Sequence, residues 1–271
     1  MSAKFSKVIA VVNQKGGVAK TTTAVNLATA FAAVNLKTLI IDLDPQGNAS
    51  TGLNIQMSDR RKNIYRVLIN EVSSKESIKP SIVPNLYIIP SCVDLSAAEI
   101  ELINLNNREY LLKKSIKEVI ENYDKIIIDC PPSLGLLTIN ALAAADSIVI
   151  PLQCEFFALE GLAHLLKTIE LVKNNINRKL DILGVLLTMY DRRNRLTEEV
   201  EKDVRECLQD KVFTTVIPRN IKLSEAPSHG LPALIYDHKC SGSQAYAYLA
   251  KEILDKEKII TTNTTEESIY A

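Results

Sequence analysis

The chain has 271 residues, of which 46% are hydrophobic and 24% are charged. This length supports one sizeable domain with a full core, and no apolar stretch approaches the length of a transmembrane helix. The chain has 32 basic residues (Lys and Arg) and 32 acidic residues (Asp and Glu), so its net charge is zero. Its overall charge therefore cannot attract nucleic acid. Any such binding must come from a local patch.

The N-terminus and the cysteines indicate a cytosolic protein. Residues 1–7 run straight into an apolar segment without the h-region of a signal peptide. The five cysteines are far apart, odd in number and free of any C-x-x-C pair, which argues against a disulfide framework and against a zinc site.

Short apolar runs alternate with amphipathic ones along most of the chain. The predicted strands are 7–13, 37–43, 86–90, 125–130, 147–152, 181–189 and 212–217. The predicted helices are 20–34, 62–70, 95–104, 109–122, 134–144, 159–175, 196–208 and 241–258. Strands that read as continuous Val/Ile/Leu runs are buried on both faces, which predicts an α/β fold with a mostly parallel sheet covered by helices on both sides. Residues 1–260 are expected to form a single domain, and the polar segment 261–271 is expected to be disordered.

A glycine-rich segment follows the first predicted strand and opens the first predicted helix. It reads Lys15-Gly16-Gly17-Val18-Ala19-Lys20-Thr21-Thr22. A strand, a glycine turn and a helix N-terminus form a phosphate-binding loop, because backbone N–H groups and the helix dipole favour anions there. Lys20 is placed to reach the β- and γ-phosphates, and the Thr21 hydroxyl is placed to bind Mg²⁺.

Two further motifs carry aspartates at the ends of predicted strands. The second strand ends in Ile40-Ile41-Asp42-Leu43-Asp44-Pro45-Gln46-Gly47-Asn48, and acidic residues leaving a strand toward a phosphate site suit hydrolysis. A turn that merely caps the next segment is the alternative. The run Ile126-Ile127-Ile128-Asp129 reads as a Walker B strand, in which Asp129 binds Mg²⁺ directly or through water.

The glycine-rich segment departs from the usual G-x-x-x-x-G-K-[ST] pattern, because Gln14 and Ala19 stand at the two glycine positions. It matches the deviant form K-G-G-x-x-K-[ST]-[ST] and, together with D-x-D-P-Q-G-N, resembles the ParA/MinD family of P-loop ATPases. Members usually carry glycine at the position of Ala19, so this departure bears on nucleotide affinity. Ala19 itself requires a backbone conformation that an L-residue can adopt.

The resemblance extends over about residues 7–255 and favours the chromosomal Soj-type group. It implies that Asp44 orients or activates the attacking water and that Pro218 and Asn220, in Ile217-Pro218-Arg219-Asn220, border the adenine of ATP. It also implies that Lys15 reaches the nucleotide of a second subunit, so that ATP drives formation of a homodimer. Lys15 would then stabilise the charge that develops in phosphoryl transfer. A contact within the same chain and a solvated lysine are the alternatives.

Three arginines lie within four positions in Arg192-Arg193-Asn194-Arg195. In Soj-like proteins, basic residues at the positions of Arg193 and Lys222 bind DNA without sequence preference, and Arg195 is a further candidate. A solvated charged turn is the alternative. The resemblance also implies a ParB-type partner that stimulates slow ATP hydrolysis, a role in chromosome or plasmid partitioning, and a cytoplasmic protein that associates with the nucleoid when ATP is bound.

Three other interpretations stay open. A MinD-like membrane regulator would use an amphipathic C-terminal helix, but Glu252, Asp255 and Glu257 make the polar side of this helix acidic, which favours packing on the core. A small-molecule ligase would need a substrate pocket, for which there is no sequence signature. Cys92 and Cys130 lie in regions comparable to the cluster ligands of the related nitrogenase iron protein, but their flanks favour reduced, buried thiols.

Overall fold

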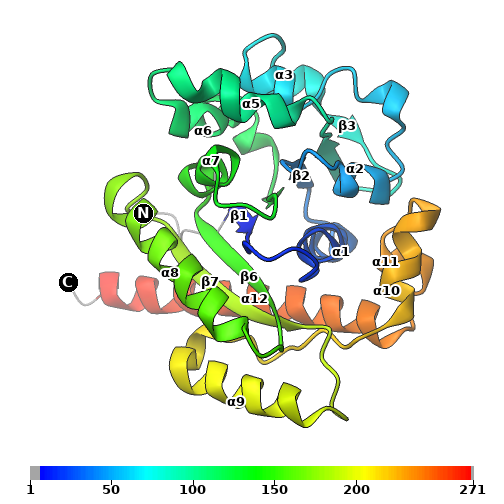
Figure 1. Ribbon diagram of the computed structural model, residues 1–271, viewed down its shortest axis with the longest axis vertical. Coiled ribbons are helices and arrows are strands. Elements are labelled where there is room, and N and C mark those ends of the chain that lie inside the picture. The colour runs from blue at the N-terminus through cyan, green and yellow to red at the C-terminus, as the bar shows by residue number, and fades with distance from the viewer. Residues whose placement is uncertain (1–6, 270–271) are drawn as a thin grey trace.

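The structure is a computed structural model that describes the backbone of residues 7–269 and the side chains of residues 7–257. At its centre is a seven-stranded sheet in the order β3-β4-β2-β5-β1-β6-β7 (Figure 1). All neighbouring strands pair in parallel except β3 and β4, which are antiparallel at one edge. The strands are β1 (Val8–Val11), β2 (Thr38–Asp42), β3 (Lys79–Pro80), β4 (Leu86–Ile89), β5 (Lys125–Asp129), β6 (Ser147–Gln153) and β7 (Asp181–Thr188).

Twelve α-helices lie in the described part of the chain. They are α1 (Lys20–Ala33), α2 (Asn48–Gly52), α3 (Ile64–Leu68), α4 (Ser74–Ser77), α5 (Leu95–Glu101), α6 (Leu111–Ile116), α7 (Leu136–Ala144), α8 (Ala158–Asn175), α9 (Arg195–Leu208), α10 (Ile221–Glu225), α11 (Ala233–Tyr236) and α12 (Ser241–Ile269). Among these described residues, no helix is both long and apolar enough to cross a membrane.

Each face of the sheet carries its own apolar cluster. In β1, Val8 and Ala10 join the cluster formed with α3, α5, α6, α7, α8 and α9, whereas Ile9 and Val11 join the cluster formed with α1, α2, α11 and α12. This alternation follows from the two-residue period of a strand. The mostly parallel sheet with helices on both faces that the sequence predicts is therefore confirmed (Figure 1).

The predicted strand at 212–217 is wrong. The segment forms no strand: Val212 makes an isolated bridge to Val185 of β7, and just beyond the segment Pro218 makes another to Tyr190, which follows β7. Between those bridges the Glu252 carboxylate of α12 accepts hydrogen bonds from the backbone N–H groups of Thr214 (2.8 Å) and Thr215 (2.9 Å). A side chain from a distant helix thus takes the amides that a ladder would need.

Several helices also differ from their predicted bounds. The predicted helix at 109–122 forms only as α6, flanked by the 3-10 turns Arg108–Tyr110 and Ile120–Asn122. Asn140 of α7 explains its start, because its Oδ1 atom accepts from Leu112 N (3.1 Å) and its Nδ2 atom donates to Arg108 O (2.8 Å). The backbone of α12 is helical beyond the predicted end at residue 258, but the side chains of 258–271 lie outside the described residues, so disorder of 261–271 stays a prediction.

The apolar side of α12 packs on the sheet. Leu249 and Ile253 are fully buried in the same cluster as α1, and the Tyr246 hydroxyl lies 3.1 Å from the Thr23 hydroxyl. Packing of this part of the helix on the core agrees with the prediction from its acidic polar side.

Candidate nucleotide-binding site

The glycine-rich loop lies between the end of β1 and the start of α1, as the sequence predicts. Gly17 has φ of 75°, a left-handed conformation that glycine adopts without strain. The Thr188 hydroxyl at the end of β7 donates to the carbonyl oxygen of Val18 (3.1 Å). The loop is thereby tied to the second half of the chain, which local sequence could not show.

Ala19 is the N-cap of α1 and also has a left-handed backbone, with φ of 66° and ψ of 34°. An L-residue can adopt this conformation, but the Cβ atom of alanine is crowded there at a cost of roughly 1–2 kcal/mol. The position before Lys20 is therefore one at which glycine fits and alanine is strained.

Lys20 is buried at the start of α1 with 6% of its surface exposed. Its Nζ atom donates to the carbonyl oxygen of Lys15 (2.7 Å). Burial lowers the pKa of Lys20, and the nearby charges of Asp129 and Asp44 oppose this shift. The structure thus brings together the lysine and the two aspartates that the sequence assigns to one site.

The sheet order explains this convergence. Strands β2, β5 and β1 are neighbours, so their carboxyl ends lie side by side. Asp42 of β2 pairs in register with Asp129 of β5, and Asp44 follows two residues later with 6% exposure. Ligands of open parallel sheets bind at this edge.

Asp129 is fully buried, and neither of its carboxylate oxygens has a well-formed hydrogen bond among the described residues. Burial raises its pKa well above the usual range, and the charge of Asp42 adds to this rise, whereas the Thr21 side chain and Lys20 oppose it. Buried polar atoms are normally satisfied, so an orphaned carboxylate beside a threonine hydroxyl has the donor set that a hard cation prefers.

Asp42, which the sequence analysis did not assign a role, is the best-anchored acid of the group. Its Oδ2 atom accepts from the Ser50 backbone N–H (2.8 Å) and from the Ser50 hydroxyl (2.6 Å). Burial nevertheless raises the pKa of Asp42 to about 6. In the sequence, the only indication of a role for Asp42 is its position two residues before Asp44.

Lys15 contacts an acid of its own chain. Its Nζ atom forms an ion pair with the carboxylate of Glu155, which lies two residues beyond β6, and both side chains are about half exposed. The contact within one chain that the sequence left as an alternative is therefore present in this structure. Glu155 lies 140 positions away and has no sequence signal for this role.

Thr21 and Thr22 line a cavity of about 260 Å³ beside the loop, together with Asn48 of α2 and with Leu223 and Pro227. Asn220 caps α10, because its Oδ1 atom accepts from Lys222 N (2.8 Å), and its Nδ2 atom donates to the Ser241 hydroxyl (3.0 Å). Both polar groups of this amide are thus engaged within the chain.

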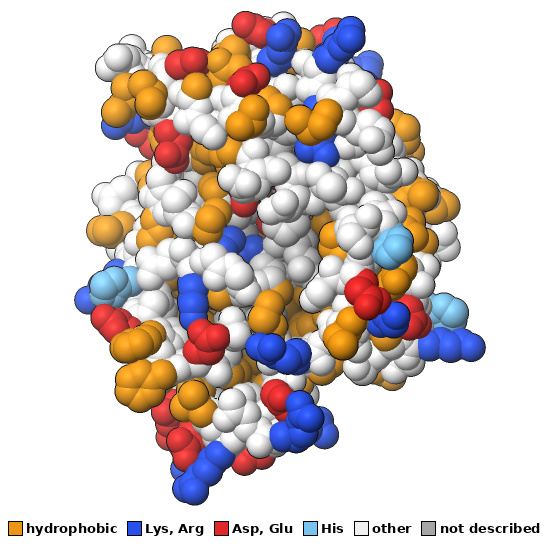
Figure 2. Space-filling model, turned by 45° about the vertical axis from the view of Figure 1, so that its right-hand side comes forward, with side chains coloured by type: hydrophobic (Ala, Val, Ile, Leu, Met, Phe, Trp, Pro, Cys, Tyr) orange, Lys and Arg blue, Asp and Glu red, His pale blue; other side chains and the backbone are white. Residues whose placement is uncertain are grey.

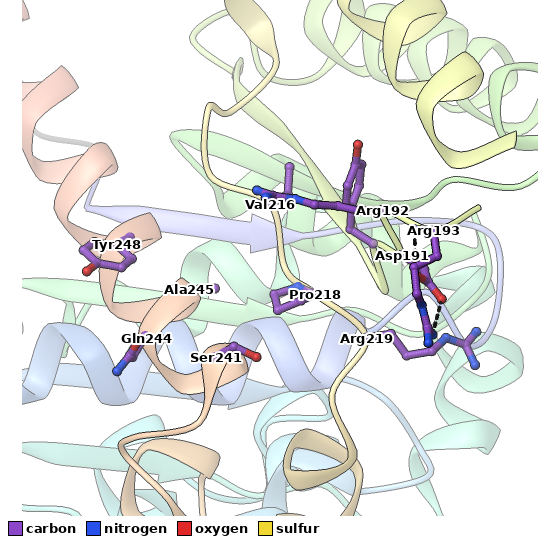
Figure 3. A pocket seen from close by; sticks show the side chains of 11 residues that line it. Asp191, Arg192, Arg193, Val216, Pro218, Arg219, Ser241, Gln244, Ala245 and Tyr248 are labelled. Carbon is purple, nitrogen blue, oxygen red and sulfur yellow. Dashed lines mark hydrogen bonds and ion pairs between the residues drawn. The ribbon is translucent and has the colours of Figure 1, made fainter. Parts of the chain in front are cut away.

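Pro218 lines a second, larger groove of about 590 Å³. Figure 3 shows Arg193 and Arg219 on one side of this groove, near Asp191, and Ser241, Gln244 and Tyr248 of α12 on the other. The Tyr190–Pro218 bridge joins the two segments that supply these arginines. Arg219 was not among the sequence-predicted DNA contacts.

The three predicted DNA-binding cations each have an acidic neighbour close in sequence. Arg193 is bidentate to Asp191 (2.9 Å for both contacts), Arg195 pairs with Glu199 (3.0 Å) and Lys222 pairs with Glu225 (2.9 Å). Arg192 and Arg219, in contrast, make no ion pair among the described residues. In Figure 2, Lys and Arg side chains gather at the lower end of the molecule with acidic side chains among them.

The loop, the aspartates and the sheet define a P-loop nucleotide-binding protein. A family model described as an AAA domain matches residues 6–182. The chain belongs to the ParA/MinD family of P-loop ATPases. It is 53% identical over 260 residues to the chromosome partitioning protein ParA of Caulobacter vibrioides, covering 95% of this chain and 97% of that protein. It is 52% identical over 249 residues to the sporulation initiation inhibitor protein Soj of Bacillus subtilis, covering 92% and 98%.

Solved structures agree on the fold. The cobyrinic acid a,c-diamide synthase of Mycobacterium smegmatis with bound ADP and magnesium is 34% identical with a TM-score of 0.83, covering 94% of this chain and 96% of that one. The cell division ATPase MinD of Pyrococcus furiosus is 27% identical with a TM-score of 0.76, covering 93% and 99%.

Proposed function

We propose that this chain binds Mg·ATP at the glycine-rich loop, dimerises when ATP is bound, and holds DNA without sequence preference in chromosome or plasmid partitioning. One observation carries the proposal: Lys20, Asp44 and Asp129 converge behind the loop at the carboxyl edge of the sheet. Relatives that carry the chromosome-partitioning name over nearly their whole length support the same assignment.

The phosphates would lie against loop residues 15–22, with Lys20 moving from the Lys15 carbonyl oxygen to the β- and γ-phosphates. Thr21 and Asp129 would hold Mg²⁺, whose charge offsets that of the phosphates when it is bound. A cation would also relieve the unfavourable burial of Asp129. Pro218 and Asn220 remain the proposed neighbours of the adenine.

Asp44 would orient the water that attacks the terminal phosphate. Its carboxylate is nearly buried, and its Oδ1 atom accepts from Gln46 N (3.0 Å), which fixes its direction. Proton transfer and orientation by a held carboxylate are effective only when the geometry is fixed in advance.

Lys15 would contact the nucleotide bound to a second subunit, so that dimerisation depends on ATP. A triphosphate at an interface needs cations from both partners, so ATP stabilises the dimer by binding it more tightly than the monomer. For this, Lys15 must leave Glu155, and an exposed ion pair of this kind opposes the move by only about 0.2–1 kcal/mol.

DNA would bind along Arg193, Arg195 and Lys222, with Arg219 and Arg192 beside them on the 590 Å³ groove. Unpaired guanidinium groups give up no internal ion pair when they meet phosphate, so Arg192 and Arg219 are well suited to add affinity. A dimer presents two such surfaces, which makes DNA affinity depend on ATP. The proposed stimulating partner is a ParB-type protein, and the proposed location is the cytoplasm and, with ATP, the nucleoid.

Two measurements test the proposal. DNA binding should appear with ATP, be absent with ADP, and be lost in Lys20→Ala. Lys15→Ala should keep ATP binding but lose ATP-dependent dimerisation and hydrolysis. Dimers of Lys15→Ala detected by light scattering with ATP would contradict the role of Lys15, and equal DNA binding with ATP and ADP would contradict the switch.

A further inference from the structure

Arg60 is a buried cation outside the nucleotide loop, with 6% of its surface exposed. It follows the 3-10 turn Met57–Asp59. No carboxylate of the described residues pairs with it, and burial lowers its pKa while the charge of Asp42 opposes that shift. Burying an arginine without an ion pair is costly, so its hydrogen bonds must compensate.

All of its side-chain hydrogen bonds go to the segment around α2. Nη1 donates to the carbonyl oxygen of Gly47 (3.3 Å), Nη2 donates to the Thr51 hydroxyl (2.9 Å), and Nη2 and Nε donate to the carbonyl oxygen of Ile55 (2.8 and 3.1 Å). The planar guanidinium therefore joins the first turn of α2 to the loop after it.

Gly47 connects this contact to Asp44. Gly47 has φ of 63°, and a Cβ atom there would lie 2.6 Å from Arg60 Nη1, so the guanidinium fills the space that a side chain would need. The Gly47 N–H donates to the Asp44 carbonyl oxygen (2.9 Å), and Gln46 N donates to the Asp44 carboxylate. The turn that Arg60 holds is the turn that orients Asp44.

We propose that Arg60 is a positioning residue that fixes Asp44 for hydrolysis by clamping the Gly47 turn. This rests on the proposed ATPase function. Arg60 acts through Gly47 and touches neither the loop nor Lys20. Its loss should therefore slow the chemical step and leave nucleotide binding nearly unchanged, since small misplacements of a reacting group are costly.

The test uses the full chain with Arg60→Met, which keeps the aliphatic length and removes the donors, and Arg61→Met at the exposed neighbouring position as control. We expect kcat for ATP hydrolysis to fall about tenfold with KM within about twofold, and Arg61→Met to match the parent. Amide hydrogen exchange in the nucleotide-free Arg60→Met chain should rise at Gly47 and Thr51.

Thr51→Val provides a second, gentler variant if Arg60→Met does not fold, because it removes only one of the two Nη2 acceptors and the Thr51 bond to the Gly47 carbonyl oxygen. It should lower kcat about threefold in the parent chain and by less than that when added to Arg60→Met, because the contact between Thr51 and Arg60 is then already lost. Unchanged kcat in a folded variant with a lower melting temperature would make Arg60 purely structural and overturn the proposal.

The exchange measurement keeps this test separate from the proposed function. A parent chain that hydrolyses no ATP would contradict the proposed ATPase, whereas unchanged amide exchange at Gly47 in Arg60→Met would contradict the clamp in either case.

Discussion

Lys15 and Glu155 form an ion pair within one subunit, although they are 140 positions apart and follow different strands of the sheet, β1 and β6. The lysine that the family resemblance assigns to a second subunit is thus held by an acid of its own chain. The pair is half exposed, so water and salt weaken it.

Glu155→Gln should therefore favour the ATP-bound dimer. Removing the competing carboxylate relieves a cost of about 0.2–1 kcal/mol in each of the two subunits, which predicts a dimer dissociation constant lower by about two- to thirtyfold. Analytical ultracentrifugation with ATP measures this, with Glu160→Gln, an exposed acid in α8, as the control. An unchanged constant would show that Glu155 does not restrain Lys15.

Ala19→Gly should stabilise the free chain. The left-handed backbone at this position strains alanine but not glycine. Glycine loses more conformational entropy on folding, so the expected net gain in stability is about 1 kcal/mol. Thermal unfolding should show a rise of about 2–4 °C. The same substitution at Ala247, exposed inside α12, should instead lower stability by about 1 kcal/mol. A melting temperature for Ala19→Gly at or below that of the parent would contradict the strain.

Asp42 should give the nucleotide-free chain an unusual pH dependence. Burial raises its pKa from 3.8 in the unfolded chain to about 6, so the folded state binds the proton more tightly. Its contribution to stability is therefore largest below about pH 4 and falls by up to about 3 kcal/mol as pH rises through 6.

Urea unfolding at pH 5 and pH 7.5 tests this directly. Asp42→Asn can still accept from Ser50 and should flatten the pH dependence over this interval. A parent chain and an Asp42→Asn variant with the same dependence would show that Asp42 titrates near its usual value.

Arg193→Glu should abolish ATP-dependent DNA binding at low salt, because it replaces a phosphate contact by repulsion on both subunits of the dimer. Arg178→Glu makes the same charge change at an exposed position before β7, at the opposite end of this strand from Arg193, and should leave binding within about twofold. Gel shifts in 50 mM and 200 mM salt measure both. Normal binding by Arg193→Glu at low salt would contradict the proposed DNA surface around Arg193.

The sequence alone determined the parts of this protein that depend on neighbouring residues. The strand, glycine turn and helix of residues 8–33 are encoded by a contiguous segment, and Asp44 and Asp129 are marked by their places near the carboxyl ends of apolar strands. Strand burial on both faces predicted the parallel sheet, and from that sheet followed the common edge at which Lys20, Asp44 and Asp129 meet.

Tertiary structure decided what depends on contacts between distant segments. The pairs Lys15–Glu155 and Arg60–Gly47 have no local pattern, because each joins a side chain to a group that only folding brings within reach. For the same reason, the sequence could not show that Glu252 binds the backbone of residues 212–217, where a strand was expected. Ala19 shows the limit most clearly: its residue type favours a right-handed backbone, and the phosphate loop between β1 and α1 holds it in the left-handed one.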